Sequence, residues 1–186
     1  MASLAEKEIG VRGYLTLNEM NNGFGRSGDC VKYGRWMAIY KAECLNINLR
    51  QMEQKYLGQP WCAEFISYVA YISGIDRSVV PVTSDTLKMG ETSCAYNEWQ
   101  GISQIKRGDV IFFSPISALR GLDGQKAVHH VAIVVNSNVI KGKLVIVHGN
   151  SFDDVVKRSL LHLDDTGRIL APNSWKNEYI AGYISV

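Results

Sequence analysis

The sequence predicts an α+β protein in which helices come first and an antiparallel sheet follows. In the first half, apolar side chains recur at helical spacing, as Tyr33, Met37 and Tyr40 do. After Gly108 the period changes, and short apolar runs alternate with turn-forming segments. Because short loops join these runs, we expect helices packed on an antiparallel sheet of about five or six strands.

Length and charge restrict the class of protein. The chain has 186 residues, 46% of them hydrophobic, which suits one domain with a buried core. We expect a single catalytic domain over residues 1–186, with a helical part over about 1–105 and a sheet part over about 106–186. A net charge of +2 without a dense Lys/Arg run argues against nucleic-acid binding.

The chain shows no segment that would place it in or across a membrane. No apolar stretch has the length of a transmembrane helix, and the first residues lack the apolar region of a secretory signal. We therefore expect export by a route that needs no cleaved leader, or a leader that this sequence does not include.

The helical part contains one element with a well-marked start. Phe65, Val69 and Ile72 form an apolar stripe on a helix that starts close to Cys62 and stops at Gly74. The other segments expected here are a helix and turn over 2–20, a Gly/Asn-rich loop over 21–29, a helix over 30–45, a short helix or ordered loop over 48–58, and loops with a short helix around 86–90 over 78–103.

The sheet part contains apolar runs of strand length separated by Gly, Asn and Asp. The strongest strands are expected over 109–114, 128–135 and 144–150, and weaker ones over 155–163, 168–170 and 179–186.

Cys62 lies in PWCAEF, at the start of the expected helix. At that position a thiol meets unpaired backbone N–H groups and the positive end of the helix dipole, and both favour the thiolate. A buried cysteine is more often a small core residue. A catalytic role therefore depends on a base brought near it in space.

Histidines in the predicted strands are candidates for that base. His129 and His130 point to opposite faces of their strand, so at most one of them faces the helix. His148 and Asn150 share a face at the end of the next strand. If the two strands are neighbours, one of the paired histidines stands beside His148, and with Cys62 they would form a nucleophile, base and orienting group.

Four segments in this order resemble the CHAP domain, a family of cysteine- and histidine-dependent amidohydrolases and peptidases that cut bacterial peptidoglycan. They are PWCAEF, KRGDVIFF, HHVAIVV and IVHGN. The family is related in fold to the NlpC-type cell-wall peptidases, so the resemblance implies a papain-like fold. It covers most of the chain, and it is weakest at the N-terminus and over 75–105.

The resemblance assigns roles to individual residues. It implies that Cys62 is the nucleophile and that His130, which directly precedes V-A-I, is the general base. His148 stands where the family usually has glutamate, and Asn150 matches the family asparagine and would help hold the imidazole. The resemblance leaves open which of the two orients His130. Gln59 is a weaker candidate for an oxyanion donor beside the Cys62 backbone N–H. The reaction requires no metal and no cofactor.

The implied function is hydrolysis of a peptidoglycan amide bond in the periplasm or cell wall. We expect a monomer that is a phage lysin, an interbacterial effector or a housekeeping hydrolase, and an effector would have a cognate immunity protein. The sequence leaves open which amide is cut. Aromatic candidates for a glycan or peptide groove are Tyr96, Trp99 and Trp175.

Three alternatives remain at this stage. Cys30 follows Asp29 and opens an expected helix, as many NlpC-type nucleophiles do. His130, His148 and Asp153 are the candidate ligands of a zinc site, although no HxH or HExxH spacing is present. A non-catalytic wall-binding or protein-interaction module would need no reactive thiol. Cys44 is expected in the core and Cys94 in a loop.

Overall fold

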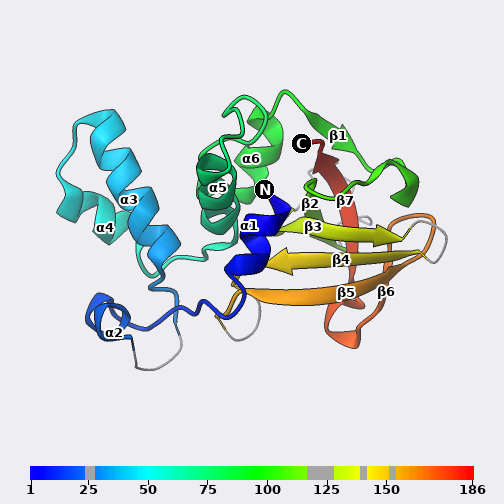
Figure 1. The fold of residues 1–186 in the computed structure, drawn as a ribbon, viewed down its shortest axis with the longest axis horizontal. Helices are drawn as coiled ribbons and strands as arrows, with labels where there is room; N and C mark the ends of the chain where they lie inside the picture. Colours follow the sequence, from blue (N-terminus) through cyan, green and yellow to red (C-terminus); the bar gives the residue numbers. More distant parts are fainter. Residues whose placement is uncertain (24–27, 117–127, 139–141, 151–153) are drawn as a thin grey trace.

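The computed structural model describes residues 1–23, 28–116, 128–138, 142–150 and 154–186. Within these ranges the protein is α+β, with helices packed beside one antiparallel sheet, as the sequence predicted (Figure 1). The sheet has seven strands in the described residues instead of the five or six expected.

The strands occur in the order β1-β7-β2-β3-β4-β5-β6, and every neighbouring pair is antiparallel. The last strand along the chain, β7, lies between β1 and β2. The additional strand is β1, in a region that we expected to be loop and short helix. The strand bounds are β1 Tyr96–Glu98, β2 Val110–Pro115, β3 His130–Asn138, β4 Lys143–His148, β5 Lys157–Leu163, β6 Ile169–Ala171 and β7 Glu178–Ile184.

The helices are shorter and more numerous than the sequence indicated. Their bounds in the described residues are α1 Ala2–Lys7, α2 Leu17–Asn22, α3 Lys32–Leu45, α4 Leu49–Tyr56, α5 Cys62–Ile72 and α6 Thr86–Thr92. The helix expected over 2–20 is wrong as a single element. Gly10 adopts a left-handed φ of 93°, and the chain then extends so that Tyr14 bridges Cys30.

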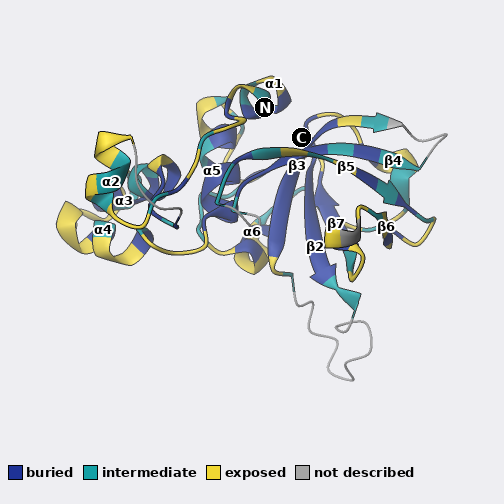
Figure 2. Cartoon of the chain, turned by 90° about the horizontal axis from the view of Figure 1, so that it is seen from below, coloured by how far each residue is buried: buried dark blue, intermediate teal, exposed yellow. Residues whose placement is uncertain are grey.

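Both faces of the central strands are covered. On one face α5 packs on the sheet, and we call this side the helix-side core; it includes Trp61, Phe65, Phe112, Val131 and Ile133. On the other face lies the far-side core, which includes Phe113, Ala132, Val134, Ile146 and Trp175. Neighbouring residues of β2 and β3 therefore alternate between two dry layers, which explains their continuous apolar runs. Figure 2 shows both strands buried along most of their length.

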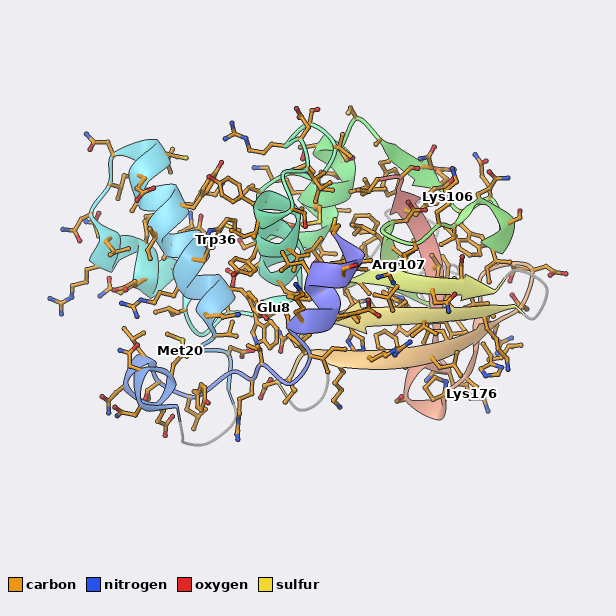
Figure 3. The ribbon with its side chains drawn as sticks, in the orientation of Figure 1. Glu8, Met20, Trp36, Lys106, Arg107 and Lys176 are labelled. Carbon is orange, nitrogen blue, oxygen red and sulfur yellow. The ribbon has the colours of Figure 1, made fainter. Side chains whose placement is uncertain are left out.

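Helices α3 and α4 form a third, smaller core to one side of α5, built on Met37, Ala38, Met52 and Tyr56 among others. Trp36 joins this unit to α5 because its ring contacts Tyr68 and Tyr71 (Figure 3). No helix in the described ranges is long and apolar enough to cross a lipid bilayer.

Two residues expected in the core are exposed. Ile72 is 52% exposed because it is the last residue of α5 and lies beyond the buried first turns of that helix. Cys44 is also exposed, in the last turn of α3. Both side chains lie at the C-terminal end of their helix, past the elements that bury its earlier turns.

Candidate active site

The start of α5 is fixed by the residue before it. Trp61 is fully buried and precedes Cys62, the first residue of the helix. Its ring lies so close to the turn after β4 that a Cβ added at Gly149 would overlap it. The tryptophan therefore holds the first turn of α5 against the end of β4.

Asn150 ties the same point to the loop before α3. With its amide oxygen facing Trp61, Asn150 accepts a hydrogen bond from the Trp61 backbone N–H at 3.0 Å and donates to Asp29 and Asp154, at 3.2 Å each. Its φ of 55° lies in the left-handed region, which asparagine tolerates better than most residues. These bonds hold the residue before Cys62, whereas the sequence led us to expect that Asn150 helps hold His130.

The Cys62 thiol lies in a buried, polar spot. Its Sγ is 3.5 Å from the Thr86 hydroxyl and faces backbone N–H groups of Ala63, Val131 and Cys62 itself. Burial raises the pKa of the thiol above its ordinary value of 9.0, and these hydrogen bonds lower it by less. The thiol is therefore neutral near pH 7 in this structure. The thiolate expected from the helix start is absent because desolvation outweighs the N–H groups.

His130 and His148 lie together, as strand alternation predicted. Their rings are 5.3 Å apart, and Trp175 packs on both, at 5.4 and 5.2 Å. His148 shares a 2.9 Å hydrogen bond with the Ser159 hydroxyl. Trp175, a candidate for a groove wall, is instead buried against the histidine pair.

Burial controls the charge of His130. It lowers the pKa of the imidazole well below 6.5, and the neighbouring histidines His148 and His129 lower it further. His130 is thus a neutral imidazole, the form that can accept a proton. Its buried Nε2 has no hydrogen-bond partner among the described residues.

Cys62 lies beside the backbone of β3 next to His130, the base of the predicted set. The Val131 N–H faces the Cys62 sulfur, so the thiol lies beside the first residues of β3. The His130 ring, however, contacts Phe113 in the far-side core, whereas Cys62 belongs to the helix-side core. Within the described part of the chain, no hydrogen bond joins the two side chains.

A cavity of about 440 Å³ lies beside the thiol. Thr86, which contacts the Cys62 sulfur, lines it together with Gln59 and His129. His129 Nε2 is 3.4 Å from Glu178 Oε1, and burial raises the pKa of that carboxyl while His129 lowers it. Sequence reasoning missed the contact of Thr86 with the thiol, and it missed Ser159 and Glu178. The sequence indicated only a short helix around 86–90 there, and the N-cap of that helix is Asp85.

Thr86 should control the reactivity of the thiol. We expect alkylation of Cys62 by iodoacetamide to speed up continuously as the pH rises through 9, because the pKa is raised. Thr86→Val, which removes the hydroxyl at constant shape, should slow alkylation at pH 8 by about tenfold, the equivalent of one hydrogen bond. Thr86→Ser should react like the wild type. Mass spectrometry of the labelled peptide gives the rates, and equal rates for the valine and serine variants would contradict the assignment.

The other cysteines do not match the expectations for a nucleophile. Cys30 precedes α3, which begins at Lys32, so it does not open the helix. Its buried thiol donates to the Leu15 carbonyl at 3.6 Å, and burial raises its pKa. Cys44 and Cys94 are exposed, and none of the four cysteines, all of them described, forms a disulfide.

The alternative zinc site involves Asp153, which lies outside the described residues. Among the residues that are described, no group of three or more His, Cys, Asp and Glu side chains is placed to hold a metal ion.

Comparison of the chain with protein-family models, with curated proteins and with solved structures found no match in any of the three.

Proposed function

We propose that this protein hydrolyses an amide bond of bacterial peptidoglycan, with Cys62 as the nucleophile. The observation that carries the proposal is the position of the Cys62 sulfur at the first turn of α5, among backbone N–H groups and beside a cavity of about 440 Å³. Such N–H groups stabilise a thiolate and also the oxyanion formed when it attacks a carbonyl. The resemblance of four segments to the CHAP domain supplies the substrate class and the papain-like fold.

In the proposed reaction the Cys62 thiolate attacks the amide carbonyl carbon and a C–S bond forms. The carbonyl electrons move to the oxygen, which the N–H groups of Cys62 and Ala63 would hold. The C–N bond then breaks, the leaving amine takes the proton that came from the thiol, and water hydrolyses the thioester. Gln59 lines the cavity and could supply a further donor to the oxyanion.

His130 is the base in this proposal, with His148 orienting it. Its neutral imidazole follows from burial, and its place next to Val131 puts it one residue from the strand N–H that faces the sulfur. His130 lies on the opposite face of β3 from Cys62, so to accept the thiol proton the first residues of β3 would have to leave the sheet and change the face to which His130 points. A paired imidazolium would then favour the thiolate, which burial alone disfavours.

The test is mass spectrometry of fragments released from purified bacterial sacculi. We expect the wild type to release fragments cut at one amide, and the Cys62→Ala variant to release none. Cys30→Ala is the matched control, since it removes the other buried thiol, and should stay active. Equal release by the wild type and Cys62→Ala would show that Cys62 is not the nucleophile. No release by the wild type from several wall types would contradict hydrolysis itself.

Two histidine variants assign the base in the same assay. His130→Ala should abolish release, whereas His129→Ala should retain it if His129 only contacts Glu178. The reverse result would transfer the role of base to His129, which lines the cavity.

The biological setting follows from the substrate. The protein would act in the periplasm or cell wall, as a lysin, an effector with an immunity protein, or a housekeeping hydrolase. One observation favours a second function, a non-catalytic wall-binding module. The Cys62 thiol is only 5% exposed and makes no hydrogen bond to an imidazole among the described residues.

A further inference from the structure

A second cavity, of about 430 Å³, is lined in part by β7, and we call it the β7 cavity. It shares no lining residue with the cavity beside Cys62. Two aromatic residues line it, Trp99 directly after β1 and Tyr179 in β7. Its polar lining residues are Glu98, Thr166 and Arg168, and its aliphatic ones include Ile116 and Ala181. A hollow with apolar walls and a few polar side chains is the usual form of a binding site for a small ligand.

One wall of the β7 cavity is built by the turn between β5 and β6. Asp164 accepts hydrogen bonds from the backbone N–H groups of Thr166 and Arg168, at 2.9 and 3.0 Å, and from the Thr166 hydroxyl at 2.6 Å. Gly167 has a left-handed φ of 85°, and a Cβ added there would lie 2.7 Å from two atoms of the Trp99 indole. The indole therefore rests on the backbone of this turn, which fixes the position of the ring.

The polar side chains of the β7 cavity offer both donors and acceptors. Arg168 is exposed, and in the described part of the chain no carboxylate oxygen lies within 4 Å of its guanidinium nitrogens. The guanidinium carries only donors, while the carboxylate of Glu98 supplies acceptors. A ligand that fits this lining has apolar surface for the rings and several neutral polar groups of both kinds.

We propose that the β7 cavity binds an N-acetylated amino sugar of a glycan strand. The C–H face of a sugar ring packs against the electron-rich face of an aromatic ring such as Trp99. The acetamido methyl group suits the aliphatic wall, its carbonyl accepts from Arg168, and the ring hydroxyls donate to Glu98. The inference rests on the proposed function, because peptidoglycan strands are polymers of such sugars. It adds a subsite for a part of the wall away from the amide that is cut.

The test is an NMR titration of the wild type with a short β-linked oligomer of N-acetylglucosamine. This probe contains no stem peptide, so hydrolysis at Cys62 plays no part in the result. We expect shifts of the Gly167 amide and Trp99 indole signals. We also expect binding about five- to tenfold tighter than that of the corresponding glucose oligomer, which lacks the acetamido group and its hydrogen bond.

Two variants locate the binding. Arg168→Ala should weaken it by about tenfold, the equivalent of a hydrogen bond to a charged donor. Trp99→Ala should weaken it by a similar factor, but the indole also packs against the far-side core. Arg168 is exposed, so its variant decides the matter if Trp99→Ala fails to fold. The matched control is Arg158→Ala, which removes an exposed arginine of β5 outside the cavity lining and should bind like the wild type.

The inference would be overturned by no binding of the amino-sugar oligomer, by equal affinity for the two oligomers, or by binding that Arg168→Ala leaves unchanged. Shifts at Gly167 and Trp99 with a stem peptide but not with the sugar would assign the cavity to peptide instead. If the sugar binds here but the wild type releases no fragments from sacculi, this site stands and hydrolysis falls. If fragments are released and the sugar does not bind, hydrolysis stands and this site falls.

Discussion

Glu64→Gln should stabilise the protein at alkaline pH by about 3–5 kcal/mol, and should change its stability by less than about 1 kcal/mol near pH 4.5. Glu64 lies in the first turn of α5, two residues after Cys62, and is fully buried. Neither carboxyl oxygen has a hydrogen-bond partner among the described residues. Burial, with a smaller contribution from the charge of Asp29, raises its pKa to about 8.

The sign follows from proton binding in the two states. Between pH 4.5 and about 8 the folded protein keeps the Glu64 proton, while the unfolded chain has lost it. Stability therefore falls as the pH rises through this window, and it stays lowered above it. Glutamine cannot ionise, so the variant avoids the loss. Urea unfolding at pH 4.5 and pH 9 measures the difference.

Glu8→Gln is the control for Glu64→Gln. The Glu8 carboxylate is also buried, but it accepts a hydrogen bond from the Tyr33 hydroxyl at 2.7 Å and pairs with Lys32. At Glu8 the substitution removes a charge that Tyr33 and Lys32 stabilise, so it should destabilise the protein. A gain for Glu64→Gln that is the same at both pH values would show that Glu64 does not titrate as described.

Gly149→Ala should destabilise the protein by about 2–3 kcal/mol, as overpacking of a full core does. The added Cβ would lie 2.8 and 2.9 Å from two atoms of the Trp61 ring and closer still to a third. Because the ring is fully buried, it has no space into which it can move without displacing the start of α5. We expect a lower urea midpoint and faster alkylation of Cys62, which the displaced helix would expose.

A double-mutant cycle separates this clash from other effects of alanine. Trp61→Leu removes the ring and is itself destabilising, but Gly149→Ala should then cost little in that background. If Gly149→Ala costs the same with and without the tryptophan, its effect arises elsewhere in the turn.

The fold class was predictable because hydrophobic period is a local property. The change near Gly108 from helical to strand spacing located the sheet, and its antiparallel pairing followed from short connections. Strand β1 was not predictable, since its three residues have too little pattern and pair with β7 from the far end of the chain. The exposure of Ile72 was also missed, because the burial of an apolar helical stripe depends on which distant elements pack against it.

The site was predictable in part. The sequence placed the candidate nucleophile Cys62 at a helix start, where the structure has it, and strand alternation brought His130 beside His148. Alternation shows which residues share a face but does not show which face meets the helix, so the projection of His130 into the far-side core was hidden. The bond from Asn150 to Trp61 joins residues far apart in sequence, and no local pattern indicates it.

The two ends of the sheet limit how the protein can associate. Its outer strands, β1 and β6, have three residues each, while the nine-residue β3 and the seven-residue β7 lie inside. An outer strand with free N–H and C=O groups is the place where another chain can add by strand pairing. The apolar segments of β2 and β3, which as free peptides would be prone to aggregate, are paired on both sides. Short outer strands thus protect a β-rich chain from polymerising through its sheet.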